Sequence, residues 1–499
     1  MIWNIWWVNR AITTGQNPWF THMLFHPSGV SLLGATLHSL KGFMAVPLLW
    51  LFSFTETYNI IVILTFLVAG LGAFLLAYAV CRSYTGSLAA GFFFSFYNYH
   101  FAHAQGHLNL ISYEFLPLFI LSILMLVSRP RMVWGLFSGV FLFMIILCDY
   151  YYFVYAVAAA VLLYLYQAWS KRTLLFGLRK PFAKPMATFL VVTCFTAGVL
   201  CASFVAYNMR NPFIGGHIPE EHSLDLVNPV VPGFHWYFAN LTRAVWQQCV
   251  GNKHENSVHL GIALIILVLA AWFSKYRKRL MVYFVLAAVF LVMAFGPYLH
   301  VLGHRLQLLR LPYKHMLTLL PVAGIGGMPI RMMIMVMLFV TVIAAWSIKH
   351  LIRQKAYLGI ALLFILAVIE YLPRPMPMLR LYFTSPAHVL SKIHSTDYAV
   401  VDLSRLHTRQ GEIIPQICHG KPIIGGYLAR TPEKQHEQHV AIRRLINKQK
   451  WRELLKTYNV RYVIKHKDHR LISSLRQYEI LYQDKVHIIF DLMLPISTK

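Results

Sequence analysis

Charged residues are scarce in this chain, and acidic residues are the scarcest of them. Its 499 residues include 18 Asp and Glu against 45 Lys and Arg, and charged side chains make up only 13%. The net charge of +27 does not indicate nucleic-acid binding, because the basic residues are scattered between apolar segments and do not gather on one soluble face. No Gly-rich phosphate loop, catalytic Ser/His/Asp order or CxxC pair is present, which disfavours several enzyme classes and structural zinc.

Long apolar runs are abundant by contrast. Hydrophobic residues make up 58% of the chain, and runs such as 60–80 and 259–273 contain no charged side chain. Crossing a hydrocarbon core of roughly 30 Å takes about 20 apolar residues. We therefore predict an α-helical polytopic membrane protein with about ten spans. The spans are expected at residues 58–80, 85–103, 109–127, 132–148, 150–168, 187–207, 258–274, 280–297, 330–348 and 356–372.

The connections between these spans alternate in charge, and the alternation predicts which side each one faces. Five alternate connections together carry 15 Lys and Arg side chains and no acidic residue. They are Arg82, residues 129–131, residues 171–184, residues 275–279 and residues 349–355. An excess of Lys and Arg in short loops marks the cytoplasmic side of a membrane protein. The other connections and both chain termini are therefore expected on the outer side.

This topology divides the chain into three parts. Residues 1–57 are expected as an outer-face amphipathic loop, and residues 58–373 as the transmembrane domain with outer loops 208–257 and 298–329. Residues 374–499 are expected as a periplasmic domain. Every acidic residue before 373 lies in an outer segment or at the outer end of a span. We therefore expect the polar chemistry of this protein at the periplasmic face of the cell inner membrane.

The two ends of the chain differ from the spans. Trp3, Trp6 and Trp7 lie at helical spacing, which predicts an amphipathic helix along the outer membrane interface. No signal peptide precedes this exported segment, so we expect that one further spanning helix once preceded Met1. In the tail, YAVVDLS, VRYVIKH and HIIFDLM predict short strands and residues 438–457 predict a basic helix, together a small α/β domain. Its 21 basic and 10 acidic residues favour contact with anionic lipid headgroups.

Several motifs resemble one family of membrane enzymes. They are WNIWW (3–7), GQNPWF (15–20), FHPSGVSL (25–32), FFFSFYNYHFAHAQGHLNL (92–110), NKHENSVHLG (252–261), FGPYLHVLG (295–303), GMPIR (327–331), GKPIIGGYLAR (420–430) and NVRYVI (459–464). Together they resemble bacterial multi-pass membrane glycosyltransferases of the GT-C superfamily. The resemblance implies transfer of a sugar from a polyprenyl-phosphate donor, with a catalytic Asp or Glu in the first outer loop. In the family this acidic residue lies just upstream of the tryptophan-rich helix, and this chain begins two residues before Trp3.

Two carboxylates are the candidate catalytic residues. Asp149 and Glu114 lie at outer ends of apolar spans, where an ionisable group is expensive and therefore suggests function. Asp149 is flanked by tyrosines, which hydrogen-bond to sugars and stack on their faces. Burial of Glu114 would raise its pKa toward that of a general acid or base. The alternative for Asp149 is a helix cap.

Histidines and arginines on the same side are the candidate substrate contacts. His100, His103 and His107 would share one helix face and could bind a phosphate or a divalent metal, or simply hydrogen-bond to backbone or water. Arg310 and Arg331 lie in an expected outer loop with Arg305 and Lys314. Two roles are open for these cations: arginine binds phosphate bidentately, or the side chains anchor the loop to lipid headgroups. We select His103, His107, Arg310 and Arg331 as the phosphate contacts.

The sequence thus favours an integral membrane glycosyltransferase that uses a polyprenyl-phosphate sugar donor and a cell-envelope acceptor, a glycan or lipid. Its expected partners are membrane lipids and these two substrates, and no nucleic acid. No cofactor is assigned, and a divalent metal stays open. The alternatives are a non-catalytic or truncated inactive relative that binds a lipid carrier and, with less support, a transporter, since no broken helix pair or repeat is evident.

The topology predicts an extracytoplasmic C-terminus, because the basic loop 349–355 is followed by a single span. A reporter enzyme that is active only in the periplasm, fused after Lys499, should therefore be active in cells. The matched control is a reporter that is active only in the cytoplasm, fused at the same residue. Activity of the cytoplasmic reporter in place of the periplasmic one would overturn the topology of every span.

Overall fold

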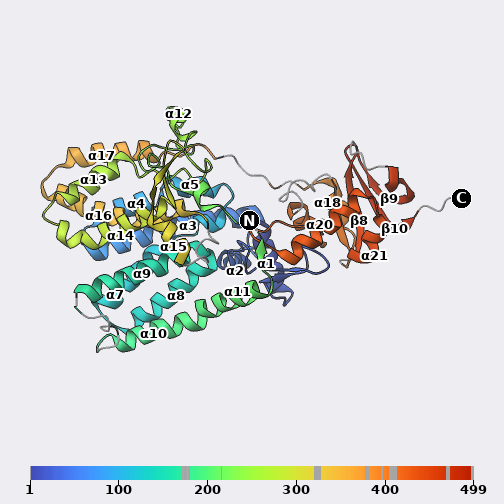
Figure 1. The fold of residues 1–499 in the computed structure, drawn as a ribbon, viewed down its shortest axis with the longest axis horizontal. Helices are drawn as coiled ribbons and strands as arrows, with labels where there is room; N and C mark the ends of the chain where they lie inside the picture. The colour runs from blue at the N-terminus through green and yellow to red at the C-terminus, as the bar shows by residue number, and fades with distance from the viewer. Residues whose placement is uncertain are drawn as a thin grey trace. The chain divides into compact units, whose positions relative to one another are not determined.

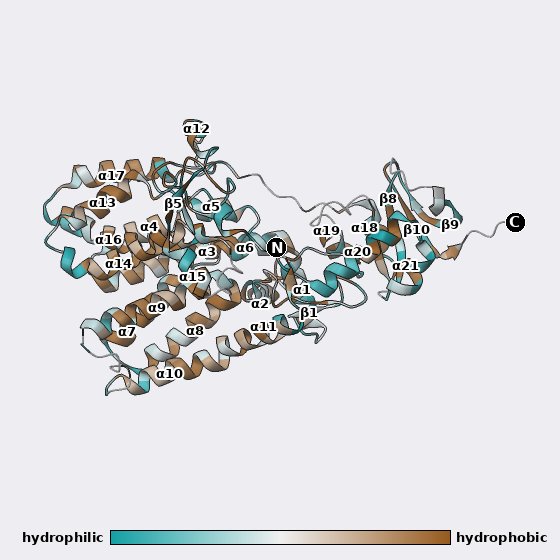
Figure 2. Ribbon diagram, in the orientation of Figure 1, coloured by the Kyte–Doolittle hydropathy of each residue, from teal (hydrophilic) through white to brown (hydrophobic). Residues whose placement is uncertain are grey.

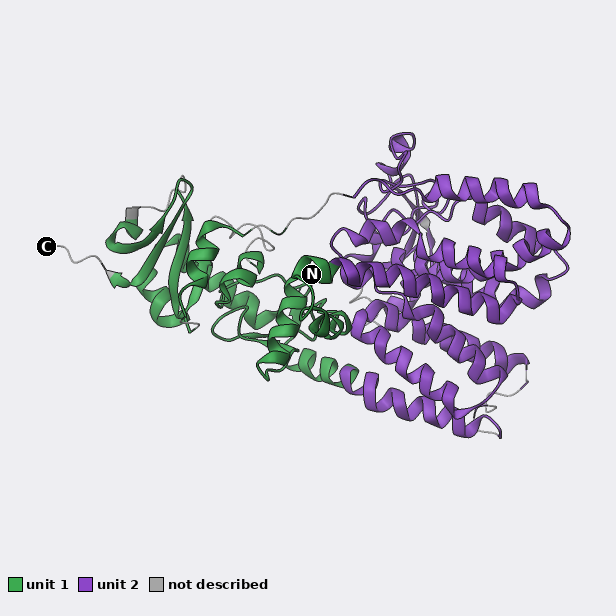
Figure 3. Ribbon diagram, turned by 180° about the vertical axis from the view of Figure 1, so that it is seen from behind, with its two compact units in different colours: residues 1–58, 201–215, 379–499 green, residues 59–200, 216–378 purple. Residues whose placement is uncertain are grey.

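The chain folds into two compact units in the computed structural model (Figure 3). Unit 1 comprises residues 1–58, 201–215 and 379–499, and unit 2 comprises residues 59–200 and 216–378. The structure describes residues 2–170, 172, 177, 180–214, 216–319, 327–376, 381, 383–394, 397–403, 413–467 and 473–495. In the predicted basic loop 171–184, the residues outside these ranges are 171, 173–176, 178 and 179. In the predicted outer loop 298–329, they are 320–326.

The helices of unit 2 coincide with the predicted spans (Figure 1). They are α3 (Phe54–Cys81), α4 (Tyr84–Ser95), α5 (Asn98–Ala104), α6 (Leu108–Ile111), α7 (Phe115–Ser128), α8 (Met132–Cys148), α9 (Tyr150–Ser170), α10 (Ala183–Thr193), α13 (Ile262–Trp272), α14 (Arg277–Ala294), α16 (Met333–Arg353) and α17 (Tyr357–Tyr371). A π-helical turn, η2 (Cys194–Gly198), joins α10 to α11 (Val199–Arg210), which continues into unit 1. Each predicted span therefore corresponds to one helix or to one interrupted helix.

Five helical segments among the described residues are long and apolar enough to cross a membrane. They are Phe54–Cys81, Leu108–Ser128, Tyr150–Ser170, Ala183–Arg210 and Pro329–Arg353. Three further apolar helices are shorter, at Met132–Cys148, Ile262–Trp272 and Tyr357–Tyr371. Hydrophobic residues cover these helices in Figure 2. The prediction of a multi-pass helical membrane protein is confirmed.

Helix α16 forms the centre of unit 2. All residues from Met333 to Ile348 are buried, and the helix packs against α4, α13, α14 and α17. A helix that is hydrophobic on every side is expected where protein surrounds it completely. The approach of α4 is close enough to require glycine at position 86, since a Cβ there would lie 2.3 Å from the carbonyl oxygen of Ala345. This tight contact holds one side of the bundle together.

The predicted span 85–103 is interrupted, and the interruption positions the candidate site. Helix α4 ends at Ser95, and α5, α6 and α7 follow after short breaks. The Tyr97 hydroxyl donates to the carbonyl of Val258 at 2.6 Å, and the Asn98 amide donates to the carbonyl of Glu370 at 3.1 Å. These buried hydrogen bonds tie the break to the loop that contains Val258 and to the last turn of α17, both distant in sequence. The short helices α5 and α6 are thereby held beside the segment 249–260.

The outer loops of unit 2 contain short elements that the sequence did not predict. They are the turns η3 (Pro219–His222) and η5 (Pro329–Met332), the helices α12 (Arg243–Trp246) and α15 (Pro312–Leu319), and a hairpin of β4 (Tyr298–Val301) and β5 (His304–Arg310). Asp225 anchors the hairpin, because its carboxylate accepts from the backbone N–H groups of Leu302 and Gly303 at 3.0 and 2.7 Å. This fully buried acid therefore stabilises a turn.

Unit 1 is a small α/β structure built from both ends of the chain. Its main sheet has the order β6 (Ala399–Asp402), β8 (Val460–His466), β10 (His487–Pro495), β9 (Tyr478–Gln483), with β6 parallel to β8 and the other pairs antiparallel. Its other elements are α1 (Ile2–Thr13), α2 (Ser39–Leu48), α18 (Ser385–Ser391), α19 (Ile413–His419), α20 (Glu433–Asn447), α21 (Trp451–Tyr458), η6 (Ser473–Gln477) and the two-residue strands β1 (Phe20–Thr21), β2 (Val30–Ser31), β3 (Phe213–Ile214) and β7 (Thr431–Pro432). The three predicted strands and the predicted basic helix, present as α20 and α21, are confirmed.

The tryptophans of α1 are core residues of unit 1, which corrects their predicted place at the membrane interface. Trp3, Trp6 and Trp7 are at most 7% exposed and pack in a hydrophobic cluster with residues of the C-terminal sheet such as Ile464 and Ile489. Trp3 Nε1 donates to Gln416 Oε1 at 2.7 Å, and Trp7 Nε1 donates to the carbonyl of Pro18 at 2.9 Å. Helical spacing predicts an apolar face but does not predict what that face contacts. In this structure the apolar face of α1 packs against other residues of unit 1.

Replacing Trp7 by alanine is expected to destabilise unit 1 by about 3–5 kcal/mol, because the fully buried ring leaves a cavity and its partner carbonyl loses a donor. The measurement is thermal unfolding of the purified full chain in detergent, together with its resistance to protease. Trp50, which is 77% exposed, provides the matched control, and Trp50→Ala should leave both unchanged. Equal effects of the two substitutions would contradict the core position of Trp7.

Candidate functional site

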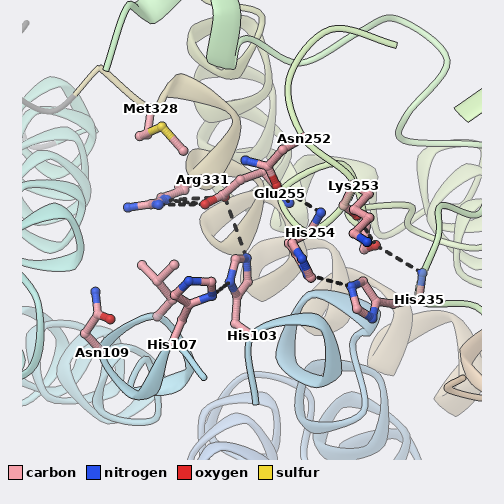
Figure 4. Close-up of polar contacts among 12 residues, drawn as sticks. His103, His107, Asn109, His235, Asn252, Lys253, His254, Glu255, Met328 and Arg331 are labelled. Atoms are coloured by element: carbon pink, nitrogen blue, oxygen red, sulfur yellow. Dashed lines mark hydrogen bonds and ion pairs between the residues drawn. The ribbon is translucent and has the colours of Figure 1, made fainter. Parts of the chain in front are cut away.

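A buried ion pair lies at the centre of the candidate site (Figure 4). Arg331, in η5, donates from Nε and Nη2 to Oε1 of Glu255 at 3.1 and 2.6 Å. The side chains of Arg331 and Glu255 are only 9% and 5% exposed. The guanidinium carbon also lies 4.7 Å from the centre of the Tyr151 ring, an arrangement suited to cation–π attraction. Two opposite charges thus compensate each other where water is largely excluded.

A tight turn directs Glu255 toward Arg331. The side-chain oxygen of Asn252 accepts from the backbone N–H groups of His254 and Glu255 at 3.0 and 3.1 Å. Asparagine favours such turns because its short side chain replaces a backbone acceptor. The Ser257 hydroxyl donates to the carbonyl of Lys253 at 3.1 Å and closes the turn further. The NKHENS segment therefore holds its glutamate in one direction.

Two histidines extend from this ion pair toward the surface. His103, at the end of α5, is fully buried, and its Nε2 lies 3.7 Å from Oε2 of Glu255. Its Nδ1 lies 3.2 Å from Nδ1 of His107, which is exposed in the short connection between α5 and α6. The His103 ring packs against Tyr99, with ring centres 4.1 Å apart. A carboxylate, a buried imidazole and an exposed imidazole therefore form a continuous row.

Asp149 lies beside the same arginine. This carboxylate, between α8 and α9, accepts from the Asn109 amide at 2.8 Å and from the backbone N–H of Tyr151 at 2.7 Å. Burial raises its pKa, an effect that the charge of Arg331 and these hydrogen bonds oppose. Because the Asp149 side chain accepts from the N–H of Tyr151, Asp149 also caps the start of α9, as the alternative prediction expected. A capping role is compatible with a place in the candidate site. One arginine therefore acts on two carboxylates.

A second histidine pair borders the cluster. His235 Nε2 and His254 Nδ1 are 2.9 Å apart, and the Gln105 amide lies 3.3 Å from His235 Nδ1. Burial lowers the pKa of His235 to about 3, with further lowering by His254, Lys253 and Arg374. His235 is therefore neutral near pH 7.

Glu255 keeps its charge in spite of its burial. Desolvation by itself would raise the pKa of this carboxyl, but the Arg331 charge and hydrogen bonds, with the nearby His103, lower the pKa to about 2. The group is therefore anionic at every physiological pH. An anion of this kind can hold a nearby N–H donor in a fixed orientation.

Four of the six predicted site residues meet in this cluster. Arg331 forms the pair with Glu255, His103 and His107 extend from it, and Asp149 is linked to it through Tyr151. Arg310 lies instead at the exposed end of β5, in register with Tyr298. Glu114 is buried at the start of α7, where its backbone carbonyl faces Gly72 of α3. Neither Arg310 nor Glu114 takes part in the contacts that define the cluster. The roles proposed for these two residues stay predictions.

His100 does not share the surroundings of His103 and His107. Its Nδ1 lies 2.9 Å from the carbonyl of Ser95 and its Nε2 lies 3.1 Å from the Thr65 hydroxyl. The ring stacks on Phe66 with centres 3.6 Å apart. The predicted common face of the three histidines is therefore wrong: α5 ends at Ala104, before His107, and His100 contacts α3 whereas His103 faces Glu255. His100 links α4 to α3, as the structural alternative expected.

The sequence-based selection missed Glu255, Asn109 and the pair His235–His254. Glu255 stands in the NKHENSVHLG motif and on the outer side, which are two signals that could have identified it. It was not selected because a glutamate in a polar loop is ordinarily solvated. Among the described residues, no group of three or more His, Cys, Asp and Glu side chains has a geometry that could hold a metal ion.

Replacing Arg331 by methionine is expected to destabilise unit 2 by about 3–5 kcal/mol, because Glu255 would remain charged and buried without its partner. The double variant Arg331→Met/Glu255→Met should lose less than the sum of the two single variants. The measurement is a double-mutant cycle from chemical unfolding in detergent. Strict additivity of the two substitutions would contradict the coupling.

The exposed pair Arg305–Glu220 provides a matched control, since its nitrogen–oxygen distance is also 2.6 Å. Its removal should cost less than about 1 kcal/mol, because water screens it. A pH series gives an independent check on the buried pair. The contribution of Glu255 should be complete above its ordinary pKa of 4.5 and should decline as the pH falls toward about 2.

Comparisons with known proteins gave matches in structure alone. No protein-family model and no curated relative matches the chain. One similar solved structure is the archaeal oligosaccharyltransferase AglB from Archaeoglobus fulgidus, in complex with an inhibitory peptide and a dolichol-phosphate (TM-score 0.44, 10% identity, covering 96% of this chain and 68% of that one). Another is ArnT from Cupriavidus metallidurans bound to undecaprenyl phosphate (TM-score 0.44, 10% identity, covering 98% and 92%).

Proposed function

We propose that this protein is an inner-membrane glycosyltransferase that transfers a sugar from a polyprenyl-phosphate donor to a cell-envelope acceptor at the periplasmic face. The observation that carries the proposal is the convergence of Asp149, Arg331 and His107 on the Glu255 ion pair. A carboxylate and an imidazole can each accept a proton, and a guanidinium can stabilise negative charge on a departing phosphate.

The sidedness of these groups supports the proposed site. They come from the α5–α6 connection, the turn between α8 and α9, the 249–260 loop and η5. All four segments lie at the ends of spans opposite to the basic loops, which is the predicted outer side. Lipid-linked substrates would meet them at the membrane surface, where the phosphate headgroup lies.

The chemistry of the reaction explains why these groups belong together. Displacing a phosphate from the anomeric carbon develops negative charge on the leaving oxygen, and a fixed cation in a water-poor site stabilises that charge. Arg331 is suited to this role because Glu255 and Tyr151 hold its guanidinium in place. A base within hydrogen-bond reach must also receive the proton of the acceptor hydroxyl.

Asp149 is proposed to contact the sugar. Its carboxylate is buried and oriented by Asn109 and by the backbone N–H of Tyr151. Carboxylates held in this way bind sugar hydroxyl groups as hydrogen-bond acceptors. Glu114 remains a proposed second polar residue from the sequence, and Arg310 a proposed outer phosphate contact.

Binding of a labelled short-chain polyprenyl phosphate to the purified protein tests this function. Arg331→Ala is expected to weaken binding by roughly 30- to 150-fold, equivalent to about 2–3 kcal/mol for a buried charge-assisted contact. Asp149→Asn should leave phosphate binding close to that of the wild type and lower sugar transfer, because it keeps the shape of the side chain without its charge. Arg310→Ala tests whether the exposed arginine contributes.

Arg305→Ala is the control, since this exposed arginine pairs with Glu220. Circular dichroism and gel filtration of Arg331→Ala separate loss of binding from loss of fold. Tight binding by correctly folded Arg331→Ala would contradict the phosphate assignment. Absence of binding to folded wild-type protein would contradict the proposed function itself, whereas binding without any transfer would identify a lipid-carrier binder.

A further inference from the structure

Dashed contacts link Glu255 to His103 and His103 to His107 in one row (Figure 4). Glu255 Oε2 lies 3.7 Å from His103 Nε2, and His103 Nδ1 lies 3.2 Å from His107 Nδ1. Glu255 and His103 are buried, whereas His107 is exposed. In a neutral histidine one ring nitrogen is a donor and the other is an acceptor. The nitrogen of His103 that carries the proton therefore determines whether His107 donates or accepts in the contact between the two rings.

The carboxylate determines the direction of the whole row. His103 Nε2 is buried without a hydrogen-bond partner and lies 3.7 Å from Oε2 of Glu255, so a proton on Nε2 is attracted to the carboxylate. A lone pair on Nε2 would face the same negative charge and would be repelled. Neutral His103 therefore carries its proton on Nε2 and presents a lone pair at Nδ1.

The tautomer of His107 follows from that of His103. The lone pair at His103 Nδ1 accepts the Nδ1–H of His107, since the two atoms are 3.2 Å apart. Neutral His107 then has its own lone pair at Nε2. His107 is exposed as a residue, and this lone pair is the one that the contacts within the row leave unused. A carboxylate that orients one imidazole is a familiar device, and here a second imidazole extends it.

We propose that Glu255 and His103 position His107, so that Nε2 of His107 accepts the proton of the acceptor hydroxyl during transfer. This role rests on the proposed function and assigns the base in it. His107 would be the catalytic residue, and Glu255 and His103 would be positioning residues. The sequence-based role of His107 as a phosphate contact would give way to this one.

The step balances without any further reagent. The acceptor oxygen forms a bond to the anomeric carbon, and the bond from that carbon to the phosphate oxygen breaks. The hydroxyl proton moves to His107 Nε2, and the electron pair of the broken bond leaves with the polyprenyl phosphate. His107 afterwards returns the proton to water or to the departing phosphate.

The charges around His107 favour a neutral imidazole that can accept this proton. Although His107 is exposed as a residue, the surrounding protein partly desolvates the ring, and this lowers its pKa. Glu255 raises the pKa, while the charges of Arg331 and His254 lower it again. When the ring becomes protonated, the His103 lone pair and the Glu255 charge stabilise the cation, because the Nδ1–H donor is retained.

Carbethoxylation of His107 by diethyl pyrocarbonate, followed by mass spectrometry across pH, measures the pKa of His107 in the purified full chain. His103→Leu is expected to lower this pKa by about one pH unit, a tenfold change in proton affinity, since the charged ring loses a hydrogen-bond acceptor. His103→Asn should restore it, because an amide oxygen can take the position of Nδ1. If both variants fold and leave the pKa of His107 unchanged, the relay is wrong.

Substrate assays separate this proposal from the proposed function. His107→Gln is expected to retain binding of short-chain polyprenyl phosphate and to lose sugar transfer by at least a hundredfold, in line with the usual contribution of a general base. Loss of phosphate binding in His107→Gln would make the residue a phosphate contact and overturn its role as base. If wild-type protein binds no polyprenyl phosphate, the pKa measurements still decide whether the relay exists.

Discussion

The buried pair of Arg331 and Glu255 constrains the polar interior of unit 2. Neither charge can stay buried without the other, since an isolated ion in a low-dielectric interior costs several kcal/mol. The pair joins segments 76 residues apart and brings η5 against the 249–260 loop. The neighbouring groups conform to it: Tyr151 covers the guanidinium and His103 faces the carboxylate. Oε2 of Glu255 accepts from Arg331 Nε at 3.3 Å and also faces His103, so the row of histidines begins at the ion pair itself.

In unit 1 the corresponding constraint is the burial of the α1 tryptophans in its hydrophobic core. The tryptophans of α1 need both a large apolar surface and a partner for each indole N–H. Trp3 finds both in the C-terminal part of the chain, through Gln416 and the cluster around Ile464. The first helix and the last strands therefore form one core, although more than 400 residues separate them in sequence. This packing explains the aromatic motif at the start of the chain.

Much of the fold could be predicted because its signals are local. The apolar runs indicated where the spans lie, and alternating strands in the tail indicated a small sheet. The candidate site could be predicted in part, since Asp149, His103, His107 and Arg331 combine an expected outer position with a side chain suited to binding sugar or phosphate. Glu255 was missed because nothing within its own loop shows that Asn252 turns it inward. The common face expected for His100, His103 and His107 is not formed because it required one continuous helix, and α5 ends at Ala104, before His107.

The sequence by itself determined the class of protein, the positions of the helices and the side on which polar chemistry is expected. These properties follow from hydropathy and charge, which each segment carries independently of its partners. Only the tertiary structure decided which ionisable groups meet, and hence that Arg331 compensates Glu255 while Arg310 lies exposed. The physical reason is that the energy of a charge depends on its burial and neighbours within a few ångströms, and those neighbours come from distant parts of the chain.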